Sequence, residues 1–297
     1  MKARYWQEKF MKVIFYIATM TSVIAVALIC VFLFANGISA ISKIGFVKFI
    51  SGRIWSPNQG IFGIFPMIVA SVYVTGGAIL LGVPVAILTS VFMAMYCPKI
   101  IYRPLKAAID LLAGIPSVVY GFFGLVVLVP WTREIARFLK TIGLISSAGN
   151  GSSIFVASIL LGMMILPTII GVTESSIRSV NKSHYEGALA LGSTHERAIF
   201  KVVLPAAKSG IVAGIVLGIG RAIGETMAVI MVAGNQARMP EGLFKGVRTL
   251  TGNIVIEMGY ATDLHRGALI GTGLVLFIFI LIINVSVSLL KRRSVNG

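Results

Sequence analysis

Long uncharged apolar runs, separated by short polar segments, set the pattern of this chain. Six runs are long enough to cross about 30 Å of hydrocarbon, a distance that needs on the order of twenty helical residues. They cover residues 13–35, part of 54–98, 111–131, 154–173, 206–234 and 268–290. The pattern therefore predicts six membrane-spanning helices. The second stretch is longer than one span requires, and Pro66 and Pro84 predict an interfacial start followed by a kinked crossing.

The composition supports a membrane protein. Hydrophobic residues make up 57% of the 297 residues and charged residues 12%, whereas soluble domains carry about 25% charged residues. The net charge of +16 comes from basic residues confined to the segments between the apolar runs, which argues against a nucleic-acid partner. The two cysteines and three scattered histidines have no spacing typical of a metal or redox site, so we expect no metal.

The distribution of basic residues predicts the orientation of the chain. With six spans both termini lie on one side, where the segments hold 15 Lys and Arg in about 68 residues. The opposite segments hold 10 in about 80 residues. Because cytoplasmic loops carry the excess of Lys and Arg, we expect both termini in the cytoplasm. The first apolar run, of 23 residues, is longer than the about 7–15 residues of a signal-peptide core and is read as an uncleaved span.

One inner loop, residues 183–205, is more ordered than a linker. Two Ser-x-x-Glu capping boxes, which begin at Ser183 and Ser193, predict the starts of two short helices. Gly192 lies where the first helix would end, and Pro205 predicts that the second ends at the residue before it. These local signals fit two alternatives equally well: a hairpin that contacts another protein surface and an amphipathic hairpin that lies on the membrane surface.

The fifth run carries two charges close to its middle, Arg221 and Glu225. An Arg at mid-span costs roughly 2.5–3.5 kcal/mol. The spacing of four residues predicts that the two side chains share a helix face and neutralise each other. Gly210, Gly214 and Gly218 form a stripe that favours close packing of another helix, so we expect the charges to face protein or a water-filled cavity.

Two roles for this charged pair stay open. In one, the ion pair fixes the register of the helix. In the other, Arg221 contacts an anion in transit while Glu225 holds it, because the guanidinium fork matches phosphate or carboxylate geometry.

A helix break is predicted near the inner end of the third run. Gly114 and Pro116 interrupt regular helix, and the backbone groups that they free must face protein or a cavity. Ser117 beside the break either helps to bind an anion or bonds back to its own helix. The outer segment 247–261 either lies over an outer mouth, where it meets a delivering protein, or forms a plain interfacial helix.

The spacing within residues 183–205 resembles the EAA loop of ABC importer permeases, which runs Glu-Ala-Ala, a glycine four residues later and a hydrophobic-x-Leu-Pro ending. Gly187 stands in place of the second-position Ala, and Val202 stands where Ile is usual. In that family the loop forms a coupling helix that docks into a separate ATPase subunit. The resemblance implies ATPase-coupling residues: Glu186, Gly187, Ala188, Gly192, Leu204 and Pro205.

The sequence has no Gly-x-x-x-x-Gly-Lys-Ser/Thr motif, which forms the loop that binds nucleotide phosphates. We therefore expect a partner ATPase subunit to bind ATP and Mg and to hydrolyse the nucleotide. The chain itself is expected to hold no cofactor and not to be an enzyme.

Three further segments resemble the phosphate ABC transporter permeases of the PstC type: LLAGIPSVVYGFFG at 111–124, GRAIGETMAVIMVAGN at 220–235 and VRTLTGNIVIEMGYA at 247–261. The sister PstA type typically has Ala-Pro where this chain has Met227-Ala228. The resemblance begins near residue 60, which divides the chain into an N-terminal span with the first extracytoplasmic segment (1–60) and an importer transmembrane domain (61–297). It implies an all-α polytopic transmembrane helical bundle with six spans, the type I ABC importer permease (MetI-like) fold.

This resemblance implies a permease subunit of an ATP-driven phosphate importer that works by alternating access in a bacterial or archaeal plasma membrane. The implied substrate pathway contains Arg221, Glu225, Ser117 and Thr226. The implied partners are a homologous PstA-type permease subunit, two PstB-type ATPase subunits, an extracytoplasmic PstS-type phosphate-binding protein and the lipid bilayer.

Two alternatives stay open. The first is a permease for another oxyanion, such as sulfate or molybdate. The second is an ion-coupled secondary transporter, for which an intramembrane Arg–Glu pair is also natural, although no inverted repeat of six-span halves supports it.

Overall fold

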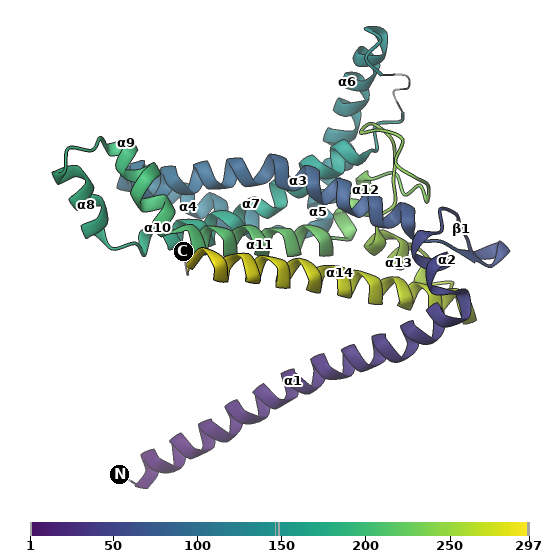
Figure 1. The fold of residues 1–297 in the computed structure, drawn as a ribbon, viewed down its shortest axis with the longest axis horizontal. Coiled ribbons are helices and arrows are strands. Elements are labelled where there is room, and N and C mark those ends of the chain that lie inside the picture. The colour runs from purple at the N-terminus through teal and green to yellow at the C-terminus, as the bar shows by residue number, and fades with distance from the viewer. Residues whose placement is uncertain (1, 146, 148, 296–297) are drawn as a thin grey trace.

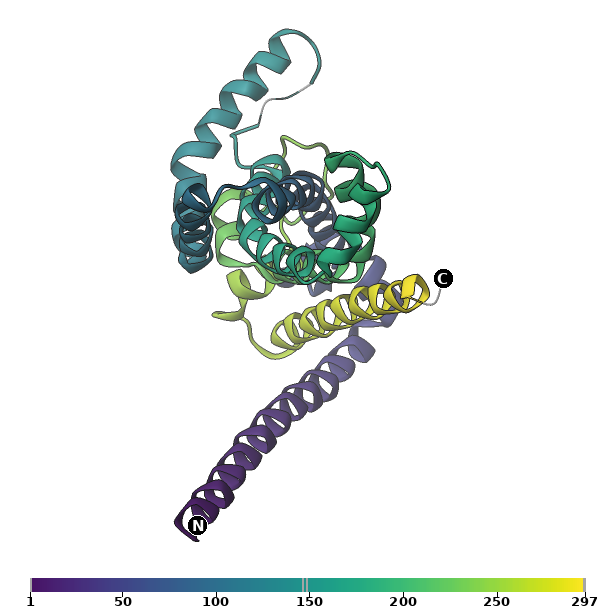
Figure 2. The ribbon, with the colours of Figure 1, turned by 90° about the vertical axis from the view of Figure 1, so that its left-hand side faces the viewer.

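Helices dominate the computed structural model, which describes residues 2–145, 147 and 149–295 (Figure 1). Long helices that lie side by side form a bundle, and a further long helix, α1 (Lys2–Ile44), diverges from it (Figures 1 and 2). The bundle contains α3 (Phe65–Val91), α7 (Ile154–Arg178), α11 (Lys208–Gly224) and α14 (Asp263–Val295).

Shorter elements connect these helices and cover both ends of the bundle. A two-residue antiparallel pair, β1 and β2, sets Trp55 opposite Phe62. The other elements in the described residues are α2 (Phe46–Ser51), β1 (Trp55–Ser56), η1 (Pro57–Gln59), β2 (Ile61–Phe62), η2 (Phe92–Tyr96), α4 (Lys99–Gly114), α5 (Ser117–Phe123), η3 (Gly124–Leu128), α6 (Val129–Thr141), α8 (Lys182–Ala190), α9 (His195–Ala198), η4 (Ile199–Val203), α10 (Leu204–Ala206), α12 (Met227–Val232) and α13 (Leu250–Met258).

The predicted bundle of six spans is confirmed, with two differences in detail. Within the described residues five helices are long and apolar enough to cross a membrane, and a bent pair, His195–Ala206 with Lys208–Gly224, makes the sixth. The third span begins at Ser117 and continues as helix to Thr141, ten residues beyond its predicted end at 131. The fifth span is not one helix, because α11 ends at Gly224 and α12 begins at Met227.

Helix α7 lies at the centre of the apolar core. Of its apolar window, 67% is buried inside the chain. Its fully buried side chains include Leu160, Ile165 and Ile169, which pack between α3 and α11. The Ser158 hydroxyl donates a hydrogen bond to the Val74 carbonyl of α3 at 3.2 Å, so a polar group in this core is satisfied by the neighbouring backbone.

The glycine stripe of α11 packs against α7, as the sequence predicts. A β-carbon at Gly218 would lie 2.7 Å from Ile169 Cδ1, and one at Gly210 would overlap the Ser176 side chain. Because these positions carry no side chain, the backbones of α11 and α7 approach closely. This contact sets the short distance between α7 and α11, the helix that carries Arg221.

A second apolar cluster closes the end of the bundle at which β1 and β2 lie. Phe49 of α2, Trp55 of β1, Met67 of α3 and Leu269 of α14 are all buried there. The cluster attaches the segment after α1 to the starts of α3 and α14.

Substituting Gly218 with Val should destabilise the purified chain, because the new side chain would collide with Ile169 and overpacking costs about 1–3 kcal/mol. Gly220→Val is the matched control in the same helix, since a β-carbon at Gly220 meets no heavy atom within 4 Å. Thermal unfolding in detergent, followed by tryptophan fluorescence, measures both variants. Equal losses would mean that the helix propensity of valine, and not packing against α7, causes the effect.

Candidate functional site

The fifth span is interrupted at Glu225 and Thr226. The Glu225 backbone is extended, with φ −67° and ψ 129°. Its carboxylate accepts hydrogen bonds from the backbone N–H groups of Thr226, at 3.1 Å, and Ala228, at 3.3 Å. The Thr226 hydroxyl donates to the Gly224 carbonyl at 3.1 Å. Side chains at the break therefore satisfy backbone groups at the start of α12 and the end of α11.

Arg221 lies one turn before this break and is half-buried. Its Nη1 donates a hydrogen bond to Thr168 Oγ1 of α7 at 3.3 Å. Among the described residues this is the one hydrogen bond that the guanidinium makes, so most of its N–H donors are available to a ligand. The prediction that the mid-span charge faces protein is confirmed by the contact with α7.

The predicted Arg221–Glu225 ion pair is wrong. Within the described chain no ion pair of 4.0 Å or less joins them. The physical reason is that two side chains four residues apart share a face only while the backbone stays helical, and here it leaves the helix at Glu225. Glu225 instead caps α12. Arg221 and Glu225 therefore do not form the ion pair that would fix the register of the helix.

A second break, predicted from the sequence, lies between α4 and α5. Helix α4 ends at Gly114 and α5 begins at Ser117, with Pro116 in an extended conformation. The Tyr120 hydroxyl donates to the Leu112 carbonyl at 3.0 Å, which satisfies an acceptor that the break has freed.

The two breaks lie on segments that contact each other. Helix α5 packs against α12, and a β-carbon at Gly121 would lie 3.0 Å from Ala228 Cα. Ser117 is half-buried at the start of α5, and no hydrogen bond in the described residues joins it to the break after α11.

Residues 247–261 contact the break after α11. Neither of the two sequence predictions for this segment, a cover over an outer mouth or a plain interfacial helix, includes this contact. Thr251 of α13 donates from its hydroxyl to the Glu225 carbonyl at 3.2 Å. The backbone N–H of Leu250 donates to Ser71 Oγ of α3 at 3.0 Å. Because both residues are buried, the start of α13 inserts into the bundle and contacts the break.

A buried polar cluster holds the other end of α13. The Glu257 carboxylate is bonded by Arg248, by Trp55 Nε1 at 2.8 Å and by His265 Nε2 at 2.9 Å. These partners come from β1, from the loop before α13 and from α14. The cluster therefore joins β1 to α13 and α14, although β1 is far from both helices in the sequence.

A third polar cluster lies at the opposite end of the bundle, around Glu174 of α7. The Glu174 carboxylate, only 4% exposed, accepts from Tyr102 Oη at 2.7 Å and Arg178 Nε at 2.8 Å, and Lys106 Nζ lies 3.7 Å away. Arg178 also donates to the Met93 carbonyl at 2.8 Å. The hydrogen bond to Glu174 raises the pKa of Tyr102, with burial adding to the effect. The cluster fastens α4 to α7.

The predicted helical hairpin forms, but its caps differ from the prediction. The side chains of Asn181 and Thr194 cap α8 and α9, in place of Ser183 and Ser193. Asn is as good an N-cap as Ser, so the local pattern did not decide between adjacent candidates. Gly192 ends the first helix with φ +83°, a left-handed conformation that glycine adopts without strain, which confirms the predicted glycine turn.

The prediction that helix ends before Pro205 is wrong. The chain continues through a π-helical turn, η4, into α10, where Pro205 occupies the first turn. Proline is tolerated at that position because the first N–H groups of a helix have no intrahelical acceptor. Leu204 and Pro205 therefore lie just before the 70° bend that leads into α11.

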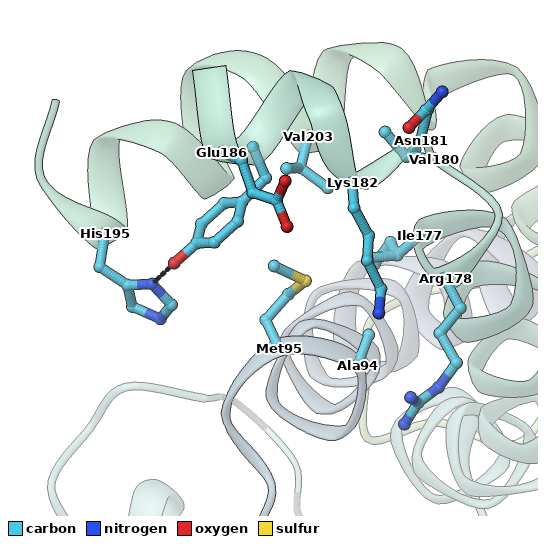
Figure 3. A pocket seen from close by; sticks show the side chains of 11 residues that line it. Ala94, Met95, Ile177, Arg178, Val180, Asn181, Lys182, Glu186, His195 and Val203 are labelled. Atoms are coloured by element: carbon cyan, nitrogen blue, oxygen red, sulfur yellow. Dashed lines mark hydrogen bonds between the residues drawn. The ribbon is translucent and has the colours of Figure 1, made fainter. Parts of the chain in front are cut away.

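A cavity of about 370 Å³ separates the hairpin from the bundle (Figure 3). His195 and Arg178 lie on opposite sides of it, and Tyr185 is hydrogen-bonded to His195 Nδ1. Glu186 also lines this cavity. Gly187 is exposed, and a β-carbon there would meet no heavy atom of the chain within 4 Å.

Apolar side chains on the hairpin stay uncovered by the described chain. Leu191 is 91% exposed, and Leu189 and Phe200 are also exposed. Ala188 is half-buried. A face with small residues and exposed leucines is suited to close contact with another protein.

A family model described as the binding-protein-dependent transport system inner membrane component matches residues 86–296. The chain belongs to this family. The match includes both helix breaks and the hairpin.

Relatives of this permease cover most of its length. A probable ABC transporter permease protein YqgH of Bacillus subtilis is 38% identical over 277 residues, which are 90% of this chain and 85% of the relative. The phosphate transport system permease protein PstC of Mesorhizobium japonicum is 34% identical over 265 residues (86% and 81%). PstC 2 of Mycobacterium tuberculosis is 33% identical over 304 residues (98% and 93%). The predicted similarity to PstC-type permeases is confirmed.

Solved structures confirm the predicted importer permease fold. A chain of a bacterial ABC transporter for the import of alginate superposes with a TM-score of 0.61 at 17% identity, over 98% of this permease and 99% of that chain. A chain of the MetNI methionine ABC transporter gives 0.59 at 18% identity, over 81% and 99%.

Sequence reasoning missed the residues that bond to the break after α11 from other helices and those that join α4 to α7. Thr168 and Thr251 carry no local signal, because they reach Arg221 and Glu225 from other helices. Tyr102 is bonded to a residue 72 positions away. The one available signal was the spacing of four between Glu174 and Arg178 on a helix.

Replacing Glu174 with Gln should destabilise this permease by about 1–3 kcal/mol, because Arg178 and Lys106 lose their counter-charge in a buried site. Glu134→Gln is the control, since Glu134 pairs with Arg137 on the surface with its side chain 68% exposed, and such pairs contribute about 0–1 kcal/mol. Thermal unfolding of the purified variants provides the comparison. A Glu174 variant as stable as the Glu134 variant would show that the cluster does not hold α4 in place.

Proposed function

We propose that this chain is the permease subunit of an ATP-driven phosphate importer and forms part of its translocation pathway by alternating access. The observation that carries the proposal is the break after α11, because among the described residues no carboxylate pairs with the Arg221 guanidinium in the bundle. Relatives named for phosphate transport support the choice of anion.

The proposed anion contact is Arg221. A guanidinium presents parallel N–H donors that match two oxygens of a phosphate, and its hydrogen bonds to an oxyanion are stronger where water is scarce. Glu225 faces the backbone of α12 and does not compensate this charge, so the anion would meet an unpaired cation. Ser117 and Thr226, one at each helix break, are proposed to add hydroxyl groups to the pathway.

The geometry also bears on the two alternatives. An ion-coupled secondary transporter was suggested by an intramembrane Arg–Glu pair, and that pair is not formed between Arg221 and Glu225. A permease for sulfate or molybdate would use the same guanidinium chemistry, so competition in an uptake assay separates it from a phosphate permease.

The proposed assembly contains a homologous PstA-type permease subunit, two PstB-type ATPase subunits and an extracytoplasmic PstS-type phosphate-binding protein. The apolar window of α1 is left unburied by the rest of the described chain, which offers a face to a second permease subunit and to lipid. The exposed leucines of the hairpin 183–205 and its Glu186–Ala188 segment would contact an ATPase. ATP and Mg would be bound by that ATPase, and the hairpin and both termini would lie in the cytoplasm.

Exchanging Arg221 for Gln should reduce phosphate uptake by about tenfold or more, because a charge-assisted hydrogen bond contributes about 1.5–3 kcal/mol. Arg221→Lys should keep part of the activity, since lysine retains the positive charge but lacks the parallel N–H donors of the guanidinium. Uptake of labelled phosphate by cells that carry the whole transporter is measured at matched membrane levels, with and without excess sulfate or molybdate.

The exposed Arg238 provides a control, because Arg238→Gln removes the same charge away from the breaks. Normal uptake by the Arg221→Gln variant would refute the anion contact. Stronger competition by sulfate than by unlabelled phosphate would refute the choice of substrate.

A larger side chain at Gly187 should abolish binding of the ATPase without unfolding the permease. The Gly187→Leu side chain adds bulk to an exposed surface of the hairpin, and a β-carbon there meets no heavy atom of the chain within 4 Å. Gly192→Asp is a less specific test, because Gly192 has a left-handed backbone conformation that aspartate adopts only with strain. Co-purification of the ATPase with a tagged permease is the measurement. Gly259→Leu is the matched control, because Gly259 is also exposed and open but lies after α13 at the other end of the bundle. Retention of the ATPase by the Gly187 variant would contradict the coupling role.

A further inference from the structure

Helix α6 (Val129–Thr141) carries two series of residues on opposite faces. Its apolar face consists of Trp131, Ile135, Phe138 and Ile142, which follow a spacing of 4-3-4. Its basic face consists of Arg133, Arg137 and Lys140, which follow a spacing of 4-3. The two series are offset by two residues, and at about 100° per residue this offset puts them on opposite sides of the helix.

The chain itself does not cover the apolar face of α6. Trp131 is 53% exposed, Phe138 64% and Ile142 51% in the described structure. The buried residues of α6 are Thr132 and Ala136, with Val129 at its start, and they lie on neither face. The large apolar side chains are therefore free to contact lipid or another molecule.

The position of α6 identifies what surrounds it. Helix α6 continues the third span without interruption through the π-helical turn η3. Val129, the first residue of α6, lies close to the start of α7. A β-carbon at Gly151, three residues before α7, would touch the Val129 carbonyl oxygen. Figures 1 and 2 show α6 running away from the bundle, across the direction of α3 and α7. Because α6 is the second half of the helix Ser117–Thr141 and runs across the direction of α3 and α7, we place it along the membrane surface.

We propose that α6 is an interfacial helix that binds the outer lipid surface of the bilayer. Its apolar face inserts about 5–10 Å, to the boundary between headgroups and acyl chains, where tryptophan is favoured. The exposed Arg137 and Lys140 of its basic face contact the phosphates of anionic lipids, whereas the Nε atom of Arg133 is buried within the described chain. Three basic residues stand against one acidic residue, Glu134, which pairs with Arg137 at 2.8 Å. Lipid is favoured over a protein partner because α6 continues a helix that is long and apolar enough to cross a membrane.

Such an anchor acts on the break between α4 and α5. Helix α6 is the continuation of α5, which carries Ser117 and Tyr120 and packs against α12. Binding of α6 to the membrane surface therefore holds the outer end of a broken span while its inner end meets the neighbouring break.

Spin labels on adjacent residues of α6 test this proposal. In the full chain with Cys30→Ser and Cys97→Ser, a single label is placed by Phe138→Cys or, on the basic face, by Arg137→Cys. The protein is reconstituted in vesicles of phosphatidylcholine and phosphatidylglycerol. Collision rates are then measured with oxygen, which partitions into lipid, and with a water-soluble nickel chelate.

A several-fold higher ratio of oxygen to nickel collisions at position 138 than at position 137 is expected. High nickel collision rates at both positions would overturn the proposal, because α6 would then lie in water. Low rates with both reagents at position 138 would also overturn it, because a protein would cover the apolar face. A label placed by Ile142→Cys repeats the measurement if the Phe138 variant does not fold.

The contribution of the basic face is measured in vesicles of phosphatidylcholine alone. Without anionic headgroups, the label at position 138 should move outward, and its ratio of oxygen to nickel collisions should fall. An unchanged ratio would overturn the assignment of Arg137 and Lys140 to anionic lipid.

Discussion

Backbone polar groups inside the hydrocarbon must find hydrogen-bond partners within the protein, and the functional region of this permease depends on that constraint. One of its spans is interrupted after α11, a second break directly precedes the span that begins at Ser117, and each break frees N–H or C=O groups. At one break the Glu225 carboxylate accepts from the backbone of α12, and at the other Tyr120 donates to the Leu112 carbonyl. The breaks are stable because side chains take the place of the missing helical bonds.

The same constraint explains why Arg221 keeps its charge unpaired. A carboxylate that caps α12 cannot also turn toward a guanidinium one turn earlier, because its backbone has left the helix. Arg221 is held instead by Thr168 of α7, a neutral partner that leaves the positive charge in place. The capping role of Glu225 and the exposed charge of Arg221 are thus two consequences of one interruption in the chain.

Sequence reasoning succeeded where the signal is local and periodic. Apolar runs predicted the spans, the stripe of Gly210, Gly214 and Gly218 predicted close helix packing, and Gly192 predicted a turn. It failed where the outcome depends on residues far away in the chain. Nothing local indicates that Glu225 leaves the helix, because the hydroxyl of Thr251 that bonds its carbonyl comes from α13. The contact of Tyr102 with Glu174 is equally non-local.

A mechanical link between the hairpin and the Arg221 region follows from the geometry of α11. This helix is unbroken from the bend after Pro205 to the break at Glu225, so a displacement of the hairpin reaches Arg221 through one rigid element. Its contact with α7 is made partly by glycines, which present no side chains that interlock across the interface. Small shear movements between packed helices are a common form of conformational change. In the proposed transport cycle, the anion contact and the ATPase contact would therefore lie at the two ends of a helix that can shift along its neighbour.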